Sequence, residues 1–333
     1  MPYYNQNFKK YHAQALFADI QQTVQMNMAS SSKSTTTPRR LILWTMPRST
    51  STVFQKCFSF LPNTQILHEP FVCAFHFGPD RHPAPPGSFV ADDNLDQHHQ
   101  ELNKIKVEFP MAFNVAQCTY KFLKDEMEID FPDKELVFCK DMAYALDAKY
   151  ELLPKGYRHT FLIRNPYRVF PSYKKMLGKL IESIAGTKEF RFCDLQPPML
   201  AKNYCFQEQY ELMTYVQERG LESNPIIIDA DDLLTNPTSI MRQYCELLGI
   251  PFSETILEWP SGTEIIKSWK GARELLLGNL HEAGGYYDVA MKSTRFHPPT
   301  EMPKREDLSE DILKCVDHSM PYYQKMYDLR LKP

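Results

Sequence analysis

Several features of common protein classes are missing from this sequence of 333 residues. No apolar run approaches the roughly 20 residues needed to cross a bilayer. No hydrophobic segment stands at the start, so we expect neither a membrane span nor secretion. None of the eight cysteines forms a C-x-x-C pair, which predicts buried free thiols in a reducing compartment. The net charge of -3 gives no overall basic field, so we expect no nucleic-acid partner.

The first 39 residues differ in composition from the rest of the chain. Serine and threonine crowd the stretch MNMASSSKSTTTPRR, and Asp19 is the only acidic residue before Leu41. This composition is typical of a flexible tail, and organelle transit segments share it. We expect a flexible tail over residues 1–39, with a transit segment as the alternative, and a single domain over residues 40–333. The expected location is cytoplasmic.

Short apolar runs alternate with helix-like segments from residue 41 onward. Apolar runs without polar alternation are typical of parallel strands that are covered on both faces. The β–α alternation predicts an α/β fold with three α/β/α layers around a central parallel sheet. We predict strands over 41–45, 65–67, 135–139, 160–163 and 225–229, and helices over 52–60, 167–184, 198–219, 237–249 and 306–327.

The loop MPRSTST follows the first predicted strand and opens a helix. Ligands of open parallel sheets bind beyond the carboxyl ends of the strands, and a helix N-terminus there attracts anions. The hydroxyls of Ser49, Thr50, Ser51 and Thr52 can donate to such an anion, and Arg48 adds a cation that matches phosphate or sulfate oxygens. A helix cap needs one hydroxyl, so this surplus predicts an anion site. The Walker sequence G-x-x-x-x-G-K-[ST] is absent, which disfavours an ordinary kinase or NTPase.

A second segment, FLIRNPYRVFPSY, has the same organisation. Arg164 follows a predicted strand, Pro166 is a helix-starting residue, and Ser172 comes eight residues after Arg164. Taken alone, Arg164 could simply bind carbonyl groups at a strand end. Together with the first loop, it predicts a second part of an anion site.

The two segments together resemble the sulfotransferases that use 3′-phosphoadenosine 5′-phosphosulfate (PAPS). In that family a P-[KR]-S-[GS]-[ST]-T loop holds the 5′-phosphosulfate, and an R-[DN]-P-x5-S segment holds the 3′-phosphate. Residues 226–252 also look like the family's late strand and the helix after it. The motif forms are closer to the PRSxST and tyrosylprotein-like branches than to the common cytosolic steroid and phenol enzymes. The resemblance implies a P-loop nucleotide-hydrolase-like sulfotransferase fold, with PAPS as co-substrate.

The resemblance also implies roles for single residues. Arg48 is the first choice for assisting the leaving group. Lys140 is the second choice, with a solvated pair to Asp141 as the alternative. Arg295 in STRFHPP, or the WKG segment at 269–271, would close over the 3′-phosphate. Many members have glycine where this sequence has Thr50, so we expect the backbone there to manage without a positive φ.

We expect the catalytic base to be Glu69 or His68, with a structural role for both residues as the alternative. Glu69 is favoured because the tyrosylprotein-like branch has a proposed catalytic glutamate at a similar place, and partial burial would raise its pKa. His68 has the more suitable ordinary pKa. Neighbours in a strand point to opposite faces, so we expect only one of the two side chains to enter the site.

The expected reaction is transfer of a sulfuryl group from PAPS to a hydroxyl of a small organic acceptor. It is an in-line displacement that releases adenosine 3′,5′-bisphosphate. We expect no metal, because the spacing of His76, His82, His98 and His99 matches no usual ligand pattern. The alternatives are an inactive nucleotide-binding module and a P-loop kinase-like phosphotransferase. The sequence leaves the acceptor and the oligomeric state open.

Overall fold

The computed structural model describes residues 37–78, 80, 115–186, 189–197, 199–271 and 287–333. The chain divides into two units, Met1–Thr37 and Pro38–Pro333, and every element named below lies in the second. The predicted tail over residues 1–39 therefore lies almost entirely outside the described residues. So do most of the loop that follows His76, and the histidines His82, His98 and His99.

Six parallel strands form one sheet in the order β5-β4-β1-β3-β2-β6. All five predicted strands are present, with bounds extended or trimmed by one to three residues. The short edge strand β6 was not predicted. The strands are β1 (Arg39–Thr45), β2 (Thr64–His68), β3 (Leu136–Met142), β4 (Arg158–Ile163), β5 (Ile226–Asp229) and β6 (Trp269–Gly271).

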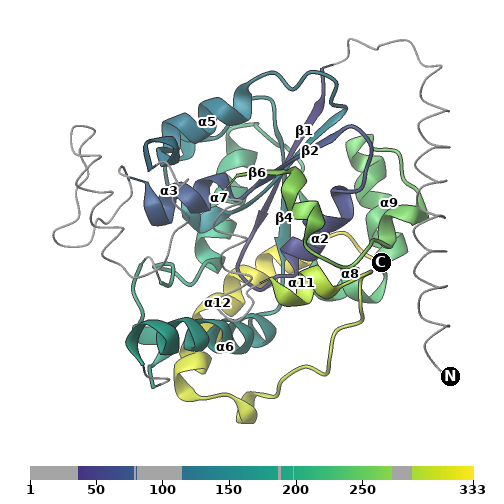
Figure 1. Ribbon diagram of the computed structural model, residues 1–333. Coiled ribbons are helices and arrows are strands. Elements are labelled where there is room, and N and C mark those ends of the chain that lie inside the picture. The colour runs from purple at the N-terminus through teal and green to yellow at the C-terminus, as the bar shows by residue number, and fades with distance from the viewer. Residues whose placement is uncertain (1–36, 79, 81–114, 187–188, 198, 272–286) are drawn as a thin grey trace, which may run out of the picture. The chain divides into compact units, whose positions relative to one another are not determined.

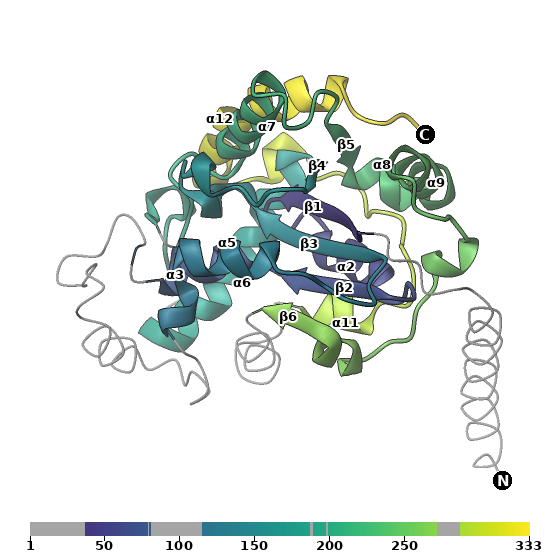
Figure 2. The ribbon, with the colours of Figure 1, turned by 90° about the horizontal axis from the view of Figure 1, so that it is seen from above.

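Helices cover both faces of this sheet, which confirms the predicted three-layer α/β/α fold (Figures 1 and 2). One layer contains α3 (Pro70–Phe77), α5 (Tyr120–Glu128), α6 (Pro166–Ala185), α7 (Phe206–Glu218) and α12 (Glu310–Asp328). The other contains α2 (Ser51–Phe58), α8 (Ala230–Thr235), α9 (Pro237–Leu248) and α11 (Asp288–Lys292). The sequence did not predict α3, α5 or α11, and α7 begins eight residues later than expected.

The central strand β1 shows how the two layers are held. Ile42 and Trp44 are buried against the layer of α3 and α7, whereas Leu41 and Leu43 are buried against the layer of α2 and α9. Alternate side chains of one strand thus supply both cores, which explains the continuous apolar run in the sequence. All eight cysteines are buried, as predicted.

The carboxyl ends of the strands meet at one edge because the sheet is parallel. Thr45 of β1 pairs with Met142 of β3, and His68 of β2 pairs with Lys140. Ile163 of β4 pairs with Asp229 of β5. The sheet order changes direction at β1, between β3 and β4, and such a switch point is where open α/β sheets bind ligands.

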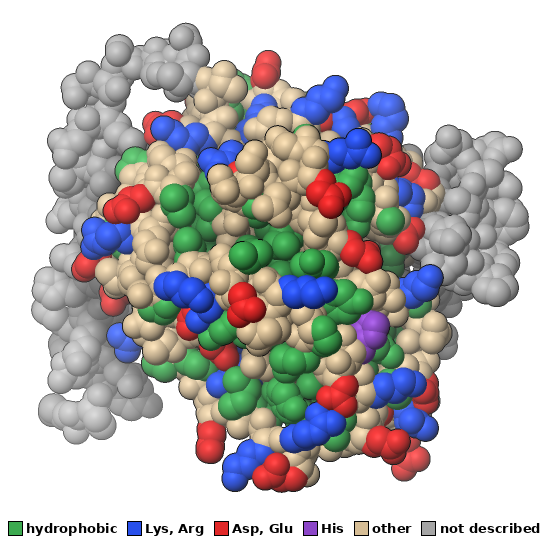
Figure 3. Space-filling model, turned by 180° about the vertical axis from the view of Figure 1, so that it is seen from behind, with side chains coloured by type: hydrophobic (Ala, Val, Ile, Leu, Met, Phe, Trp, Pro, Cys, Tyr) green, Lys and Arg blue, Asp and Glu red, His purple; other side chains and the backbone are tan. Residues whose placement is uncertain are grey.

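The surface in the view of Figure 3 has acidic and basic side chains side by side, with apolar side chains between them. No large field of one sign is visible on that face. Within the described part of the chain, no helix has the length and apolar character needed to cross a membrane.

Candidate functional site

The loop between β1 and α2 has an unusual backbone. Thr50 has φ 72° and Arg48 has φ 65°, both in the left-handed region. The expectation that Thr50 would manage without a positive φ is therefore wrong. Each such residue costs about 1–2 kcal/mol when it has a Cβ atom. Strain of this kind concentrates at functional sites, where the surrounding structure holds it in place.

The start of α2 is left without a side-chain cap. Thr50 is the N-cap residue, and its side chain makes no capping hydrogen bond. Ser49 is buried, and its hydroxyl donates to the carbonyl of Met46 at 2.8 Å. The hydroxyl hydrogen that was predicted to bind the anion is therefore used in a hydrogen bond within the loop. Thr52 remains partly exposed at the first turn, while Ser51 is buried. The N-terminus of α2 thus keeps its capacity for an external anion.

The structure brings the two predicted anion motifs together. Arg48 Nε donates to Ser172 Oγ at 3.0 Å, and Arg164 Nη1 donates to the backbone carbonyl of Arg48 at 2.9 Å. Arg48 lies more than one hundred positions from both Ser172 and Arg164 in the sequence. Ser172 is on α6, and Arg164 precedes that helix. The two cations and the hydroxyl are therefore gathered at the carboxyl ends of β1 and β4.

Asp231 holds the arginines of this cluster in place. Its carboxylate accepts a hydrogen bond from Arg168 Nε at 2.6 Å, and its other oxygen lies 3.6 Å from Arg164 Nε. Burial lowers the pKa of Arg164 and Arg48, while Asp231 partly offsets this effect at Arg164. Guanidinium groups remain charged at neutral pH, so the cluster keeps its positive charge.

Glu69 follows β2, as predicted, and forms a buried ion pair with Lys140. Burial would raise the pKa of Glu69, but the Lys140 ammonium, His68 and the Tyr287 hydroxyl together lower it to about 2. The expectation of a raised pKa is therefore wrong. Its physical reason is the fully buried Lys140, whose charge favours the carboxylate more than burial disfavours it.

The side chains of His68 and Glu69 approach each other, contrary to expectation. His68 Nε2 lies 3.7 Å from Glu69 Oε2. Glu69 lies one residue beyond the end of β2 and has φ 52°, so the alternation of strand side chains does not apply to it. His68 Nδ1 makes a 3.0 Å hydrogen bond with Gln55 Oε1, and burial lowers the pKa of His68 to about 3. His68 is therefore neutral at physiological pH.

Asp141 pairs with helix α3 rather than with its neighbour Lys140. Its carboxylate accepts the backbone N–H of Phe71 at 2.6 Å and of Val72 at 3.2 Å, in the first turn of α3. The alternative of a solvated Lys140–Asp141 pair is therefore wrong. Both side chains are buried, and each has a different partner.

The two candidates for closing the 3′-phosphate site, Arg295 and the WKG segment, stay predictions. Arg295 is exposed, and its backbone forms an isolated bridge with Glu258. Trp269–Gly271 is the edge strand β6 beside β2. A Cβ atom at Gly271 would lie 2.3 Å from the carbonyl oxygen of His68, so only glycine permits this close approach. Neither segment has a described contact with Arg164 or Ser172.

Three residues that the sequence reading did not select join the site. Tyr287 donates to Glu69 Oε2 at 3.3 Å. Gln55 binds His68, and Lys56 donates to the carbonyls of Ala290, Met291 and Ser293 at 2.9–3.2 Å. Lys56 could have been selected from the sequence, because a lysine within the apolar pattern of a helix is unusual and indicates a buried, paired charge. Tyr287 had none, because its contact spans 218 positions.

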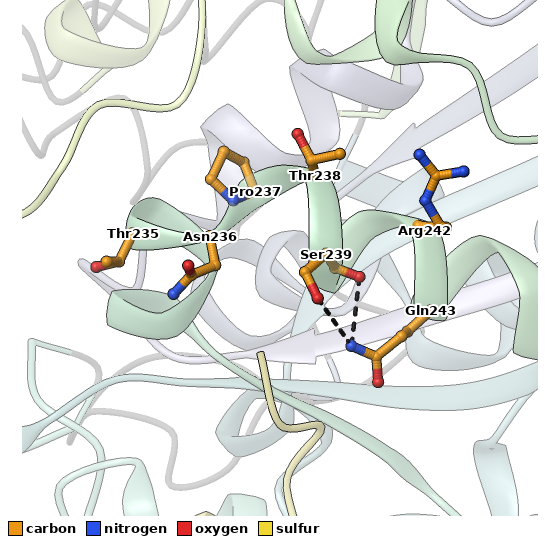
Figure 4. Close-up of a pocket in the computed structure, with 7 residues that line it drawn as sticks. All are labelled: Thr235, Asn236, Pro237, Thr238, Ser239, Arg242 and Gln243. Carbon is orange, nitrogen blue, oxygen red and sulfur yellow. Dashed lines mark hydrogen bonds between the residues drawn. The ribbon is translucent and has the colours of Figure 1, made fainter.

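An open pocket also lies at the start of α9, where Gln243 Nε2 donates to the carbonyl and hydroxyl oxygens of Ser239 (Figure 4). It is lined by Thr235, Asn236, Pro237, Thr238, Ser239, Arg242 and Gln243. None of the predicted site residues is among these. Across the described ranges, no group of three or more His, Cys, Asp or Glu residues is arranged to hold a metal ion.

A family model described as "Sulfotransferase domain" matches residues 219–329 of this chain. This segment lies outside both anion motifs, so the match is independent of them. The match agrees with the resemblance to sulfotransferases that the motifs indicated.

Relatives and solved structures give more distant similarities. An Arabidopsis thaliana protein described as "Branched-chain-amino-acid aminotransferase-like protein 2" is 24% identical over 295 residues, which cover 84% of this chain and 40% of that protein. The chain thus spans about two fifths of the length of the curated relatives it matches. Sulfotransferase STF9 from Mycobacterium avium is 15% identical with a TM-score of 0.46, covering 94% of this chain and 80% of that one. The sulfotransferase domain from the curacin biosynthetic pathway is 16% identical with a TM-score of 0.43, covering 85% and 98%.

Proposed function

We propose that this chain is a sulfotransferase that transfers the sulfuryl group of PAPS to a hydroxyl of a small organic acceptor. The observation that supports the donor is the direct contact between the two anion motifs. Arg48, Ser172 and Arg164 converge although they come from separate segments. An arginine with a purely structural role needs only one of these contacts. A ligand with two or three negative charges needs several hydrogen-bond donors at one place.

The residues present fit such a donor. The uncapped start of α2 offers backbone N–H groups, and Arg48 and Arg164 offer planar cations. Ser172 and Thr52 add hydroxyl groups. PAPS supplies the activated sulfuryl group and a bisphosphate leaving group, and the chain itself binds, orients and neutralises them.

The acceptor side of the reaction requires a base. As the acceptor oxygen bonds to sulfur, the bond from sulfur to the phosphate oxygen breaks and the acceptor loses its proton. Glu69 is the proposed recipient of that proton. Its position at the end of β2 places it at the same sheet edge as Arg48 at the end of β1. We assign Arg48 to stabilising the negative charge on the leaving phosphate.

Lys140 receives a different role from the one that the sequence favoured. Its ammonium binds Glu69, which keeps the carboxylate ionised and fixed in orientation. We therefore assign Lys140 to holding the base, with the leaving group left to Arg48. His68 is neutral and packs at 5.0 Å on the ring of Trp269, so it is assigned to supporting Glu69.

The proposal is tested by incubating the full chain with ³⁵S-labelled PAPS and a panel of phenols, aliphatic alcohols and alicyclic alcohols. We expect label transfer to at least one acceptor, with stoichiometric release of adenosine 3′,5′-bisphosphate and no dependence on added magnesium. Binding of the bisphosphate without turnover on any acceptor would instead favour the inactive binding module. Transfer from ATP that requires magnesium would favour the kinase-like alternative.

A further inference from the structure

The two carboxylate oxygens of Glu69 have different partners. Oε1 binds the ammonium of Lys140, which is fully buried. Oε2 accepts a hydrogen bond from the Tyr287 hydroxyl at 3.3 Å. His68 Nε2 lies 3.7 Å from Oε2, which is beyond hydrogen-bond range. Among the described residues, Tyr287 therefore makes the one hydrogen bond to this oxygen.

These two partners differ in how easily they can be replaced. Breaking the Lys140 contact would leave a buried charge without its partner, which is strongly unfavourable. The Tyr287 contact joins a neutral hydroxyl to the carboxylate, and 3.3 Å is long for an O–H···O hydrogen bond. An incoming hydroxyl can therefore replace Tyr287 at Oε2 at small cost, whereas Oε1 stays with Lys140.

We propose that Tyr287 is a further positioning residue of the acceptor site, whose hydroxyl occupies the place of the acceptor hydroxyl at Glu69 Oε2 and yields it when the acceptor binds. This inference rests on the proposed function, because it takes Glu69 as the base. It assigns the transferred proton to Oε2. It also makes the aromatic ring of Tyr287 a wall of the acceptor site, beside the imidazole of His68 at 5.7 Å between ring centres.

The protein fixes the segment that follows Tyr287 through a buried lysine. Tyr287 is the residue before α11, and the carbonyls at the end of α11 bind Lys56 Nζ. The Trp259 indole N–H also donates to the carbonyl of Ser293 at 3.0 Å. Lys56 lies on α2, the helix that opens at the anion loop. One helix thus supports the proposed donor site at its start and the Tyr287 segment from its last turn.

The decisive variant is Tyr287→Phe, which removes the hydroxyl and keeps the ring. The acceptor should then no longer compete with a protein hydroxyl for Oε2. We expect its KM to fall about two- to tenfold, because the hydrogen bond of Tyr287 is long and therefore weak, with kcat within about twofold of the wild type. The assay uses the panel acceptor with the highest wild-type rate, at saturating PAPS. Tyr215→Phe, a hydroxyl deletion at a partly buried tyrosine of α7, is the matched control and should change neither constant.

Three results would overturn the inference. An unchanged KM and kcat in Tyr287→Phe would show that the hydroxyl does not compete with the acceptor. A raised KM would show that it binds the acceptor instead. A tenfold fall in kcat with unchanged KM would show that it acts on the reacting atoms. All three presuppose a wild-type protein that transfers sulfate, so they are distinct from failure of the proposed function, in which the wild type transfers nothing.

Discussion

Helices α2 and α3 are similar in length and in backbone conformation at the N-cap, but they differ in what binds their N-terminal N–H groups. Each has eight residues, follows a strand of the sheet and begins after an N-cap residue in the left-handed region, Thr50 at φ 72° and Glu69 at φ 52°. The first turn of α3 binds the Asp141 carboxylate, which comes from β3. The first turn of α2 has no side-chain cap and has Arg48 in the loop before it.

The start of α3 is satisfied by hydrogen bonds within the protein, whereas we propose that the start of α2 binds a ligand. A helix N-terminus is stabilised by negative charge in either case. The protein itself supplies the acceptor oxygens to α3, from the carboxyl group of Asp141, and thereby fixes the backbone next to Glu69. At α2 the loop before the helix contains Arg48, and we propose that a bound anion supplies the negative charge. The comparison can be tested at each helix start separately.

The largest expected effect is at the start of α3. Glu69→Gln removes the proposed base, so turnover should fall about 10²- to 10⁴-fold, the usual contribution of general base catalysis. The affinity for adenosine 3′,5′-bisphosphate, measured by calorimetry, should stay nearly unchanged because the proposed binding site for that ligand is at α2. His68→Ala serves as the control. Loss of transfer in His68→Ala with activity retained in Glu69→Gln would show that His68 is the base.

Glu69→Gln should also destabilise the fold by about 3–5 kcal/mol at pH 7, because it leaves Lys140 buried without its partner. The folded pKa of Glu69 is about 2, below its ordinary value of 4.5. The stability from this group is therefore present above pH 4.5 and is lost as the pH falls toward 2. Urea unfolding of both proteins between pH 7 and pH 3 should show the gap closing with acid. A constant gap would contradict the Glu69–Lys140 pairing.

At the start of α2, Arg48→Ala should lower turnover about 10²- to 10³-fold, the size found when one donor to a developing negative charge is removed. Arg242→Ala, at an exposed arginine of α9, is the matched control and should leave the rate unchanged. Steady-state rates with labelled PAPS provide the measurement. Wild-type turnover in Arg48→Ala would exclude Arg48 from the reaction and would make the two helix starts functionally alike.

The smallest expected effect concerns the strained backbone of α2. Thr50→Gly should raise the free energy of unfolding by about 1 kcal/mol, because glycine adopts a positive φ without steric cost. The measurement is urea unfolding, and bisphosphate affinity should be retained. Ser51→Gly, one residue further along and inside the helix, should destabilise instead by a similar amount. A destabilised Thr50→Gly protein would mean that Thr50 is not strained.

The sequence predicted those parts of the fold and site that depend on local patterns. Apolar runs predicted five strands, and the two motifs, with the family that they resemble, predicted that Arg48, Arg164 and Ser172 serve one anionic ligand. The three-residue strand β6 was missed because Trp269–Gly271 has too short an apolar pattern to be distinguished from a loop.

Other features depend on contacts that no local pattern encodes. Thr50 and Glu69 adopt positive φ values although neither residue type favours them, so the surrounding structure imposes the conformation. The predicted rise in the pKa of Glu69 was wrong because the sequence suggested burial but not the ion pair with Lys140, which is 71 positions away. The role of Tyr287 could not be predicted either, because its contact with Glu69 spans 218 positions.

The central claim is that Arg48, Arg164 and Ser172 form a binding site for the bisphosphate portion of PAPS. Isothermal titration calorimetry of adenosine 3′,5′-bisphosphate against the wild type, Arg164→Ala and Ser172→Ala tests it most directly. We predict one-to-one binding by the wild type, weakened at least tenfold by Arg164→Ala and less by Ser172→Ala. Absence of binding by the folded wild type, or equal affinity in all three proteins, would contradict the account.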